Sequence, residues 1–331
     1  MSEVLLSVQD LHTSFFTDAG EVQAVNGVNF DLDRGEILGI VGESDSGKSV
    51  TAYSIMQILA DTGRITGGRI LYKGEDLATW SDKQMSGFRG KCCSIIFQDP
   101  MTSLNPVFTI GDQLKEAVVL HTDKRGREAD DRVIELLELV GINEPRKRVR
   151  QYPFELSGGM RQRVMIAMAL ACEPDILIAD EPTTALDVTI QAQILELIQS
   201  LQKKLGMAVI LVTHDLGVIA DMCDNIVVMY GGRICERGTA HEIFYNPKHE
   251  YTRGLLRSIP NINNMKKKLV PISGTPINML NLPKGCAFCP RCDSAMKICL
   301  SEVPEELWIN ENHKAACWLN VRDAFRGKED A

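Results

Sequence analysis

The stretch Gly42-Glu43-Ser44-Asp45-Ser46-Gly47-Lys48-Ser49 decides the fold of this chain. It follows the short apolar run 37–41, whose branched residues and glycine predict a buried strand. It precedes residues 50–59, in which apolar residues recur at helical spacing. A glycine-rich loop in this position turns its backbone N–H groups inward, and the helix adds unpaired N–H groups and a positive dipole end. The stretch is therefore predicted to bind a polyphosphate.

Two residues of this stretch, which we call the P-loop, have side chains suited to nucleotide chemistry. Lys48 is expected to reach the β- and γ-phosphates, and the Ser49 hydroxyl is expected to ligate Mg²⁺. A Lys-Ser pair between a strand and a helix argues against a chance glycine turn. The P-loop residues expected to bind the nucleotide are Gly42, Ser44, Asp45, Ser46, Gly47, Lys48 and Ser49.

A second motif is the apolar run 176–179, which is followed by two carboxylates. A carboxylate at the end of a strand in a P-loop protein is the typical Walker B aspartate, which holds the metal ion. Asp180 is expected to take that role. Glu181 is then expected to polarise an attacking water molecule.

Length and charge limit the possible functions. A chain of 331 residues suits roughly two domains. Its formal charge of -8 argues against a nucleic-acid partner, since nucleic-acid binders usually carry a basic excess. The longest apolar runs, such as 209–212, have the length of strands and are too short to span a bilayer. Residues 1–11 lack the features of a signal peptide. We therefore expect a cytoplasmic protein that reaches a membrane only through partners.

The order of the predicted elements indicates an α/β fold. Two strands, 5–16 and 22–32, precede the P-loop, and a mostly helical insertion is expected over 99–153. Strands then alternate with helices, which predicts a mostly parallel sheet covered on both faces. Prolines break the chain after Gly238, where we expect an appended domain.

Residues 156–162 read Leu-Ser-Gly-Gly-Met-Arg-Gln and lie just before the run 176–181. In sequence and position they resemble the signature motif of ABC-transporter ATPases. Ser157 is also a good N-cap for a following helix. The resemblance implies that this motif clasps the γ-phosphate held by the other ATPase of a dimer. It assigns that contact to Ser157, Gly158, Gly159 and Gln162.

Other positions match the same family in the order in which its motifs occur. Gln98 matches the Q-loop glutamine, which implies contacts with Mg²⁺ and the attacking water. Residues 185–187 match the D-loop, which includes Asp187. His214 matches the switch histidine at the γ-phosphate, and Phe15 matches the aromatic residue that stacks on adenine. A plain core role is the alternative for Phe15.

The resemblance implies a complete architecture. We expect a P-loop NTPase of the ABC ATPase type with a RecA-like core, an antiparallel β subdomain, a helical subdomain and a C-terminal metal-cluster extension. The ATPase domain is expected over 1–238, with its helical subdomain at about 99–160. The extension is expected over 239–331.

The tail narrows the resemblance to one subfamily. Residues 249–256 and 285–292 look like the C-terminal region of dipeptide and oligopeptide importer ATPases. In that subfamily four tail cysteines can hold an iron–sulfur cluster. By motif these are Cys286, Cys292, Cys299 and Cys317. Four thiolates suit [4Fe–4S] or Zn²⁺, so the donor types alone leave both metals open, and the resemblance favours the cluster. Cys289 is an extra thiol that could change the ligand set.

Asp45 departs from the subfamily pattern, which has glycine at this position of the P-loop. Aspartate tolerates left-handed backbone better than most residues, so the turn is expected to survive. Its carboxylate would repel the phosphates unless it is turned outward or protonated. We therefore expect a weakened nucleotide affinity rather than a different fold.

The function implied by the resemblance is ATP hydrolysis that powers peptide import. The implied partners are a second related ATPase, two transmembrane permease subunits and an extracytoplasmic peptide-binding protein, with this chain peripheral at the cytoplasmic face of the membrane. ATP and Mg²⁺ are the implied cofactors. Three alternatives stay open: a different cargo such as nickel or glutathione, a non-transport ABC ATPase, and a degenerate subunit that binds ATP without turnover.

Overall fold

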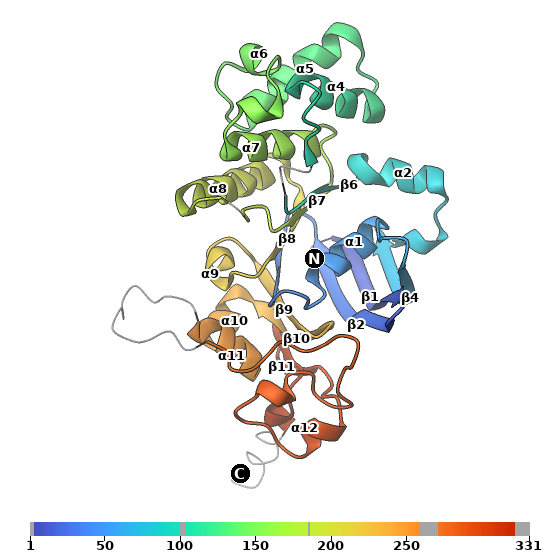
Figure 1. The fold of residues 1–331 in the computed structure, drawn as a ribbon, viewed down its shortest axis with the longest axis vertical. Helices are drawn as coiled ribbons and strands as arrows, with labels where there is room; N and C mark the ends of the chain where they lie inside the picture. Colours follow the sequence, from blue (N-terminus) through green and yellow to red (C-terminus); the bar gives the residue numbers. More distant parts are fainter. Residues whose placement is uncertain (1–2, 100–102, 185, 259–270, 322–331) are drawn as a thin grey trace. The chain divides into compact units, whose positions relative to one another are not determined.

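The computed structural model describes residues 3–99, 103–184, 186–258 and 271–321 (Figure 1). Its described residues divide into two compact units. The P-loop unit contains residues 4–32, 37–76 and 212–321. The signature unit contains residues 33–36 and 77–211, together with Glu3.

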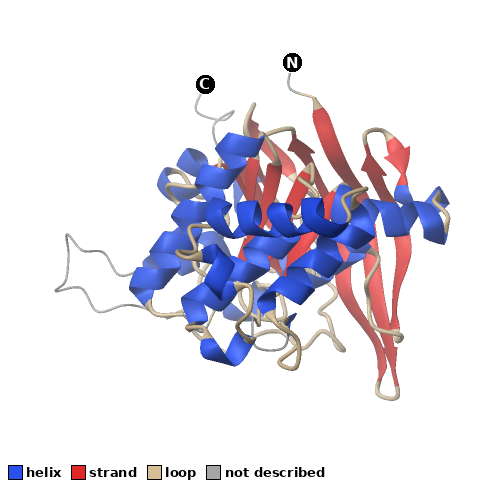
Figure 2. Ribbon diagram, turned by 90° about the horizontal axis from the view of Figure 1, so that it is seen from above, coloured by secondary structure: helices blue, strands red, loops and turns tan. Residues whose placement is uncertain are grey.

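Part of the P-loop unit is an antiparallel sheet with the strand order β2-β1-β4-β5. Its first two strands are long and form a hairpin, whose turn is closed by a hydrogen bond from Thr17 Oγ1 to the Gly20 carbonyl. The strands, drawn in red in Figure 2, are β1 (Val4–Thr17), β2 (Gly20–Asp33), β4 (Gly63–Tyr72) and β5 (Glu75–Asp76). The two strands predicted before the P-loop are thus confirmed. The pairing of β4 with β1 extends to Gly63, which faces Phe15.

The strand before the P-loop is β3 (Ile37–Val41), and all five of its residues are buried. It pairs in parallel with β9 (Asn225–Tyr230). The helix that follows the P-loop, α1 (Lys48–Met56), starts two residues earlier than predicted. Its N-cap is Gly47, so Lys48 and Ser49 form the first turn of the helix.

The chain after Gly238 adds strands to this second sheet. β10 (Arg233–Thr239) pairs antiparallel with β9 and contains the predicted domain boundary at Gly238. β12 (His313–Ala315) pairs with β10, and β11 (Leu307–Asn310) pairs with β12. The helices of this region are α10 (Ala240–Tyr245), α11 (Glu250–Arg257) and α12 (Ile298–Ser301). The described part of the tail is therefore packed onto the sheet edge.

The signature unit contains β6 (Cys93–Ile96) and β7 (Ile176–Asp180), which pair in parallel. The next strand, β8 (Ala208–Thr213), has its first four residues in this unit. The main helices are α2 (Asp82–Lys91), α4 (Ile110–His121), α5 (Gly126–Leu139), α6 (Pro145–Arg148), α7 (Gly158–Ala169) and α8 (Val188–Leu205). Helices α4, α5 and α7 pack together (Figure 1). The helical character predicted over 99–153 is confirmed for its described residues.

Every residue of β3 and β7 is buried, which explains their continuous apolar sequence. Within the residues that the structure describes, none of the helices has the length and apolarity needed to cross a membrane.

Candidate active site

The P-loop backbone passes very close to its neighbours in the P-loop unit. A β-carbon on Gly42 would lie 2.2 Å from the Met229 carbonyl oxygen, and one on Gly47 would lie 2.4 Å from that of Ala24. Gly47 also has a φ of 98°, in the region that side chains rarely adopt. Both positions therefore require glycine, for packing as well as for the turn.

Lys48 lies inside the loop that it follows. Its side chain is 4% exposed, and its ammonium group donates to the carbonyl oxygens of Gly42 at 2.8 Å and Glu43 at 2.7 Å. Ser46 Oγ lies 3.4 Å from the same nitrogen. Ser49 follows in the first turn of α1 and is half-buried. The loop thus places a buried positive charge where the sequence predicted a phosphate contact.

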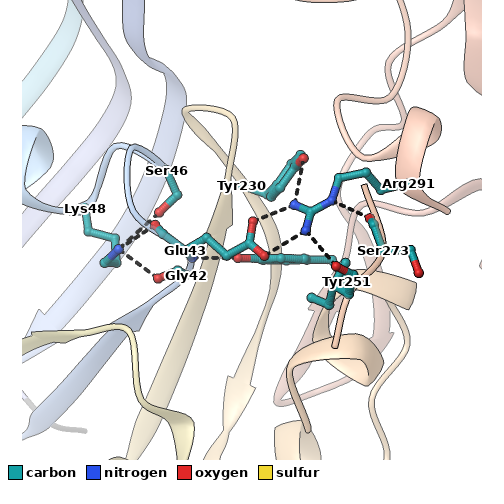
Figure 3. A network of polar contacts seen from close by, with 9 residues as sticks. Gly42, Glu43, Ser46, Lys48, Tyr230, Tyr251, Ser273 and Arg291 are labelled. Carbon is teal, nitrogen blue, oxygen red and sulfur yellow. Dashed lines mark hydrogen bonds and ion pairs between the residues drawn. The ribbon is translucent and has the colours of Figure 1, made fainter. Parts of the chain in front are cut away.

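Glu43, which the sequence did not single out, is held by the C-terminal region. Its carboxylate forms a double ion pair with Arg291, at 2.5 Å (Nη1–Oε2) and 3.0 Å (Nη2–Oε1) (Figure 3). Its backbone N–H donates to the Tyr251 hydroxyl at 2.7 Å. The P-loop and the tail are therefore in direct contact within one unit.

Asp45 adopts left-handed backbone with a φ of 60°, and its side chain is exposed. The prediction that the turn survives with aspartate here is confirmed. Ser44 is also exposed. The effect of the Asp45 carboxylate on nucleotide affinity stays a prediction.

Two further predicted residues belong to the P-loop unit. Phe15 is half-buried on β1, and its ring packs over Gly63, where a β-carbon would lie 2.7 Å from the ring. His214 directly follows β8 and is exposed. Adenine stacking by Phe15 and a γ-phosphate contact by His214 stay predictions.

In the signature unit, the end of β7 brings two predicted residues together. Gln98 Nε2 donates to Glu181 Oε2 at 2.9 Å. The Thr184 hydroxyl donates to the same oxygen at 2.9 Å. Asp180, the last residue of β7, is 1% exposed. Sequence reasoning missed Thr184, although a threonine three residues after a carboxylate is a usable signal for such a bond.

The signature residues form the start of α7. Ser157 is its N-cap and accepts a 3.4 Å hydrogen bond from the Met160 N–H, as its residue type indicated. A β-carbon on Gly159 would lie 2.8 Å from the Ile190 side chain, so glycine allows α8 to pack closely. Gln162 is 1% exposed. Within the signature unit, Gly159 of this motif therefore packs against α8.

Asp187 is the N-cap of α8 and accepts a hydrogen bond from the Ile190 N–H at 3.0 Å. Gly158 contacts Leu186, where a β-carbon would lie 3.5 Å from the leucine side chain. The other D-loop position, Ala185, lies outside the described residues. The helix cap gives Asp187 a structural role in addition to the predicted contact with nucleotide.

The tail cysteines are buried or half-buried. Burial raises the pKa of the Cys286 thiol to about 12, and the thiols of Cys299, Cys317 and Cys292 contribute to that rise. Burial likewise raises the pKa of Cys292 to about 11, with contributions from Cys317 and Cys299. Burial also raises the pKa of Cys289, but the only thiol that contributes there is Cys299. Burial thus disfavours the thiolate forms of these cysteines in the described structure.

Among the described residues, no group of three or more His, Cys, Asp or Glu side chains forms a site for a single metal ion. The assignment of Cys286, Cys292, Cys299 and Cys317 as metal ligands therefore stays a prediction.

Two family models match this chain. The ABC transporter model matches residues 25–184, and the model of the oligopeptide/dipeptide transporter C-terminal region matches residues 235–299. The chain also resembles a solved dimer of an ATP-binding cassette in a post-hydrolysis state bound to ADP and Pi. That match has 26% identity and a TM-score of 0.64, and covers 71% of this chain and 99% of the other.

Curated relatives match over nearly the whole length. The dipeptide transport ATP-binding protein DppD of Bacillus subtilis is 54% identical over 97% of this chain and 96% of its own length. The oligopeptide transport ATP-binding protein OppD of Salmonella typhimurium is 48% identical over 97% of this chain and 96% of its own length. The resemblance seen in the sequence is thereby confirmed. This chain belongs to the ATP-binding subunits of dipeptide and oligopeptide ABC transporters.

Proposed function

We propose that this chain powers the import of di- and oligopeptides by hydrolysing ATP held between its P-loop and the signature motif of a partner ATPase. The observation that carries the catalytic part is the contact of Gln98 and Thr184 with one oxygen of Glu181. Both contacts orient the Glu181 carboxylate, which then polarises the attacking water molecule. The family membership supports the transport part.

Substrate binding falls to the P-loop. Its backbone N–H groups and Lys48 neutralise the phosphate charge, and Phe15 stacks on the adenine. Ser49 and the buried carboxylate of Asp180 offer oxygen ligands of the kind that Mg²⁺ prefers. When bound, Mg²⁺ supplies positive charge to the phosphates. His214 completes the set at the γ-phosphate.

The signature residues act on the nucleotide of the partner ATPase. Ser157 and the following glycines stand at the start of α7, where helix N–H groups and the dipole favour an anion. A related but distinct ATPase, two permease subunits and an extracytoplasmic binding protein complete the transporter. The chain then works at the cytoplasmic face of the membrane.

We also propose that the tail holds an iron–sulfur cluster through Cys286, Cys292, Cys299 and Cys317. Four soft thiolate donors fit a [4Fe–4S] cluster. Two of these residues are in contact, because the Cys286 N–H donates to the Cys299 carbonyl at 2.9 Å. The cluster would fix the fold of the tail.

Transport is tested with the full transporter in vesicles. ATP-dependent uptake of a labelled dipeptide is expected, and it should stop when Lys48 is replaced by Ala. ATP hydrolysis that never drives peptide uptake would overturn the assignment of cargo.

The cluster is tested with a matched pair of cysteine variants. Anaerobically purified protein should contain iron and acid-labile sulfide. Cys292→Ser should lose them, whereas Cys289→Ser should keep them, because Cys289 lies outside the proposed ligand set. One equivalent of zinc without iron would instead assign a structural Cys₄ site.

A further inference from the structure

Arg291 connects the cysteine-rich segment to the P-loop. It lies between Cys289 and Cys292, and its side chain is 5% exposed. On the tail side, its Nε donates to the Ser273 carbonyl at 2.9 Å and its Nη2 to the Ile272 carbonyl at 3.3 Å. The remaining contacts are the Tyr230 hydroxyl at 3.3 Å and the double ion pair with Glu43 (Figure 3). The guanidinium is thus held by several acceptors at once.

Tyr251 makes a second connection to the same P-loop residue. Its side chain is fully buried, and its hydroxyl accepts the Glu43 N–H. The Tyr251 ring packs against those of Tyr230 and Phe288, with centroid distances of 4.7 and 5.3 Å. Both the backbone and the side chain of Glu43 are therefore fixed by the tail.

The position of Glu43 affects the lysine that binds phosphate. The Glu43 carbonyl accepts a hydrogen bond from Lys48 at 2.7 Å. A rotation of the Glu43 peptide would move this acceptor and the neighbouring loop amides. The segment around Cys289 and Cys292 is thus linked to Lys48 through the side chains of Arg291 and Glu43 and the Glu43 carbonyl.

We propose that Arg291 and Tyr251 are positioning residues for nucleotide binding, through which the cysteine-rich segment sets the affinity of the P-loop. The Glu43 side chain is 25% exposed, so its charge is only partly solvated. A double ion pair fixes geometry as well as charge. Loss of the guanidinium leaves the carboxylate partly buried and unpaired, which favours a rearranged loop.

The test measures MgATP and MgADP affinity by calorimetry on the full chain. Arg291→Gln and Glu43→Gln are each expected to weaken MgATP binding about tenfold, equivalent to about 1.4 kcal/mol. Arg291→Lys should recover only part of the loss, because an ammonium group cannot form the double contact. Tyr251→Phe tests the backbone contact and should also weaken binding.

The matched control is the ion pair between Arg237 and Glu306, which joins β10 to the tail without contacting the P-loop. Its Nη2–Oε2 and Nε–Oε1 distances are both 3.0 Å. Arg237→Gln should lower thermal stability about as much as Arg291→Gln does, while leaving nucleotide affinity unchanged. Equal losses of affinity in Arg237→Gln and Arg291→Gln would reduce Arg291 to a purely structural role and overturn the proposal.

Two further measurements keep the outcome clear. The double variant Glu43→Gln/Arg291→Gln should bind MgATP no more weakly than whichever single variant has the lower affinity, because the two residues act as one unit. In the assembled transporter, the KM for ATP should rise more than kcat falls. Wild-type affinity in Glu43→Gln would refute the proposal even if Arg291→Gln fails to fold. The inference rests on the proposed nucleotide site, whose failure would show as no binding by the wild type.

Discussion

Glu43 and Glu181 occupy similar places in the two units but are held in different ways. Each comes within two residues of the end of a fully buried five-residue strand. The Glu43 carboxylate is paired with a guanidinium, whereas the Glu181 carboxylate accepts from the neutral donors Gln98 and Thr184. The first environment neutralises a charge and fixes a loop. The second orients a carboxylate that we propose acts on the attacking water.

The comparison shows that position at a strand end does not by itself define a role. A double ion pair with arginine fixes geometry as well as charge. The amide and hydroxyl donors orient the Glu181 carboxylate. The two proposed roles, positioning for Glu43 and catalysis for Glu181, differ accordingly.

The largest expected effect comes from Glu181→Gln. The amide still accepts from Thr184 and Gln98 but cannot polarise water, so turnover should fall by about 10²–10⁴. MgATP should still bind, since Asp180 and the P-loop are intact. The rate of phosphate release by the assembled transporter checks this. Undiminished hydrolysis would remove Glu181 from the mechanism, and a similar fall in Glu43→Gln would erase the contrast between the two glutamates.

Acid is expected to affect the Glu43 side of the comparison through His249. His249 caps α11, which carries Tyr251, by accepting the Tyr251 N–H at Nδ1. Burial lowers the pKa of His249 from 6.5 to about 4. Below pH 6.5 the unfolded chain takes up a proton that the folded chain refuses, so stability is lost as pH falls from 6.5 to 4. The total loss is on the order of 3 kcal/mol.

The matched variant for this effect is His249→Asn, which keeps a capping acceptor and does not titrate in this range. Denaturant unfolding at pH 7 and pH 5 should show that the wild type loses about 2 kcal/mol more than the variant. Identical pH dependence would mean that His249 is protonated in the folded protein.

Thr184→Val should lower turnover less than Glu181→Gln does, and it tests the Glu181 side of the comparison. It removes one of two donors to Glu181 Oε2 while keeping the shape of the side chain. Turnover is expected to fall about tenfold, which corresponds to one hydrogen bond to a charged group. MgATP affinity should not change. A change in affinity without a change in turnover would give Thr184 a role in binding instead.

The smallest effect is expected for Asp45→Gly. Because Asp45 is exposed, its repulsion of bound phosphates is screened, and MgATP should bind at most about fivefold more tightly. MgADP should gain less, because it lacks the γ-phosphate charge. Calorimetry on the two proteins checks this. Equal affinities would make Asp45 a neutral replacement for glycine.

The sequence predicted the features that local chemistry determines. The P-loop, the strand ending at Asp180 and the Ser157 cap depend on neighbours within a few residues, so their patterns are visible in the chain. The order of family motifs singled out Gln98, but its hydrogen bond with Glu181 was not predicted. The role of Arg291 had no local signal, because an arginine between cysteines does not indicate which distant carboxylate it contacts.

The contact between Glu43 and Arg291 also has a consequence for biosynthesis. The two residues are separated by 248 positions. At a synthesis rate of about 5–20 residues per second, Arg291 is made roughly 12–50 s after Glu43. During that interval a nascent chain has a P-loop sequence but not the guanidinium and tyrosine that fix its first turn. Newly made chains should therefore acquire full nucleotide affinity only when the tail has folded, which delays ATP capture until the subunit is complete.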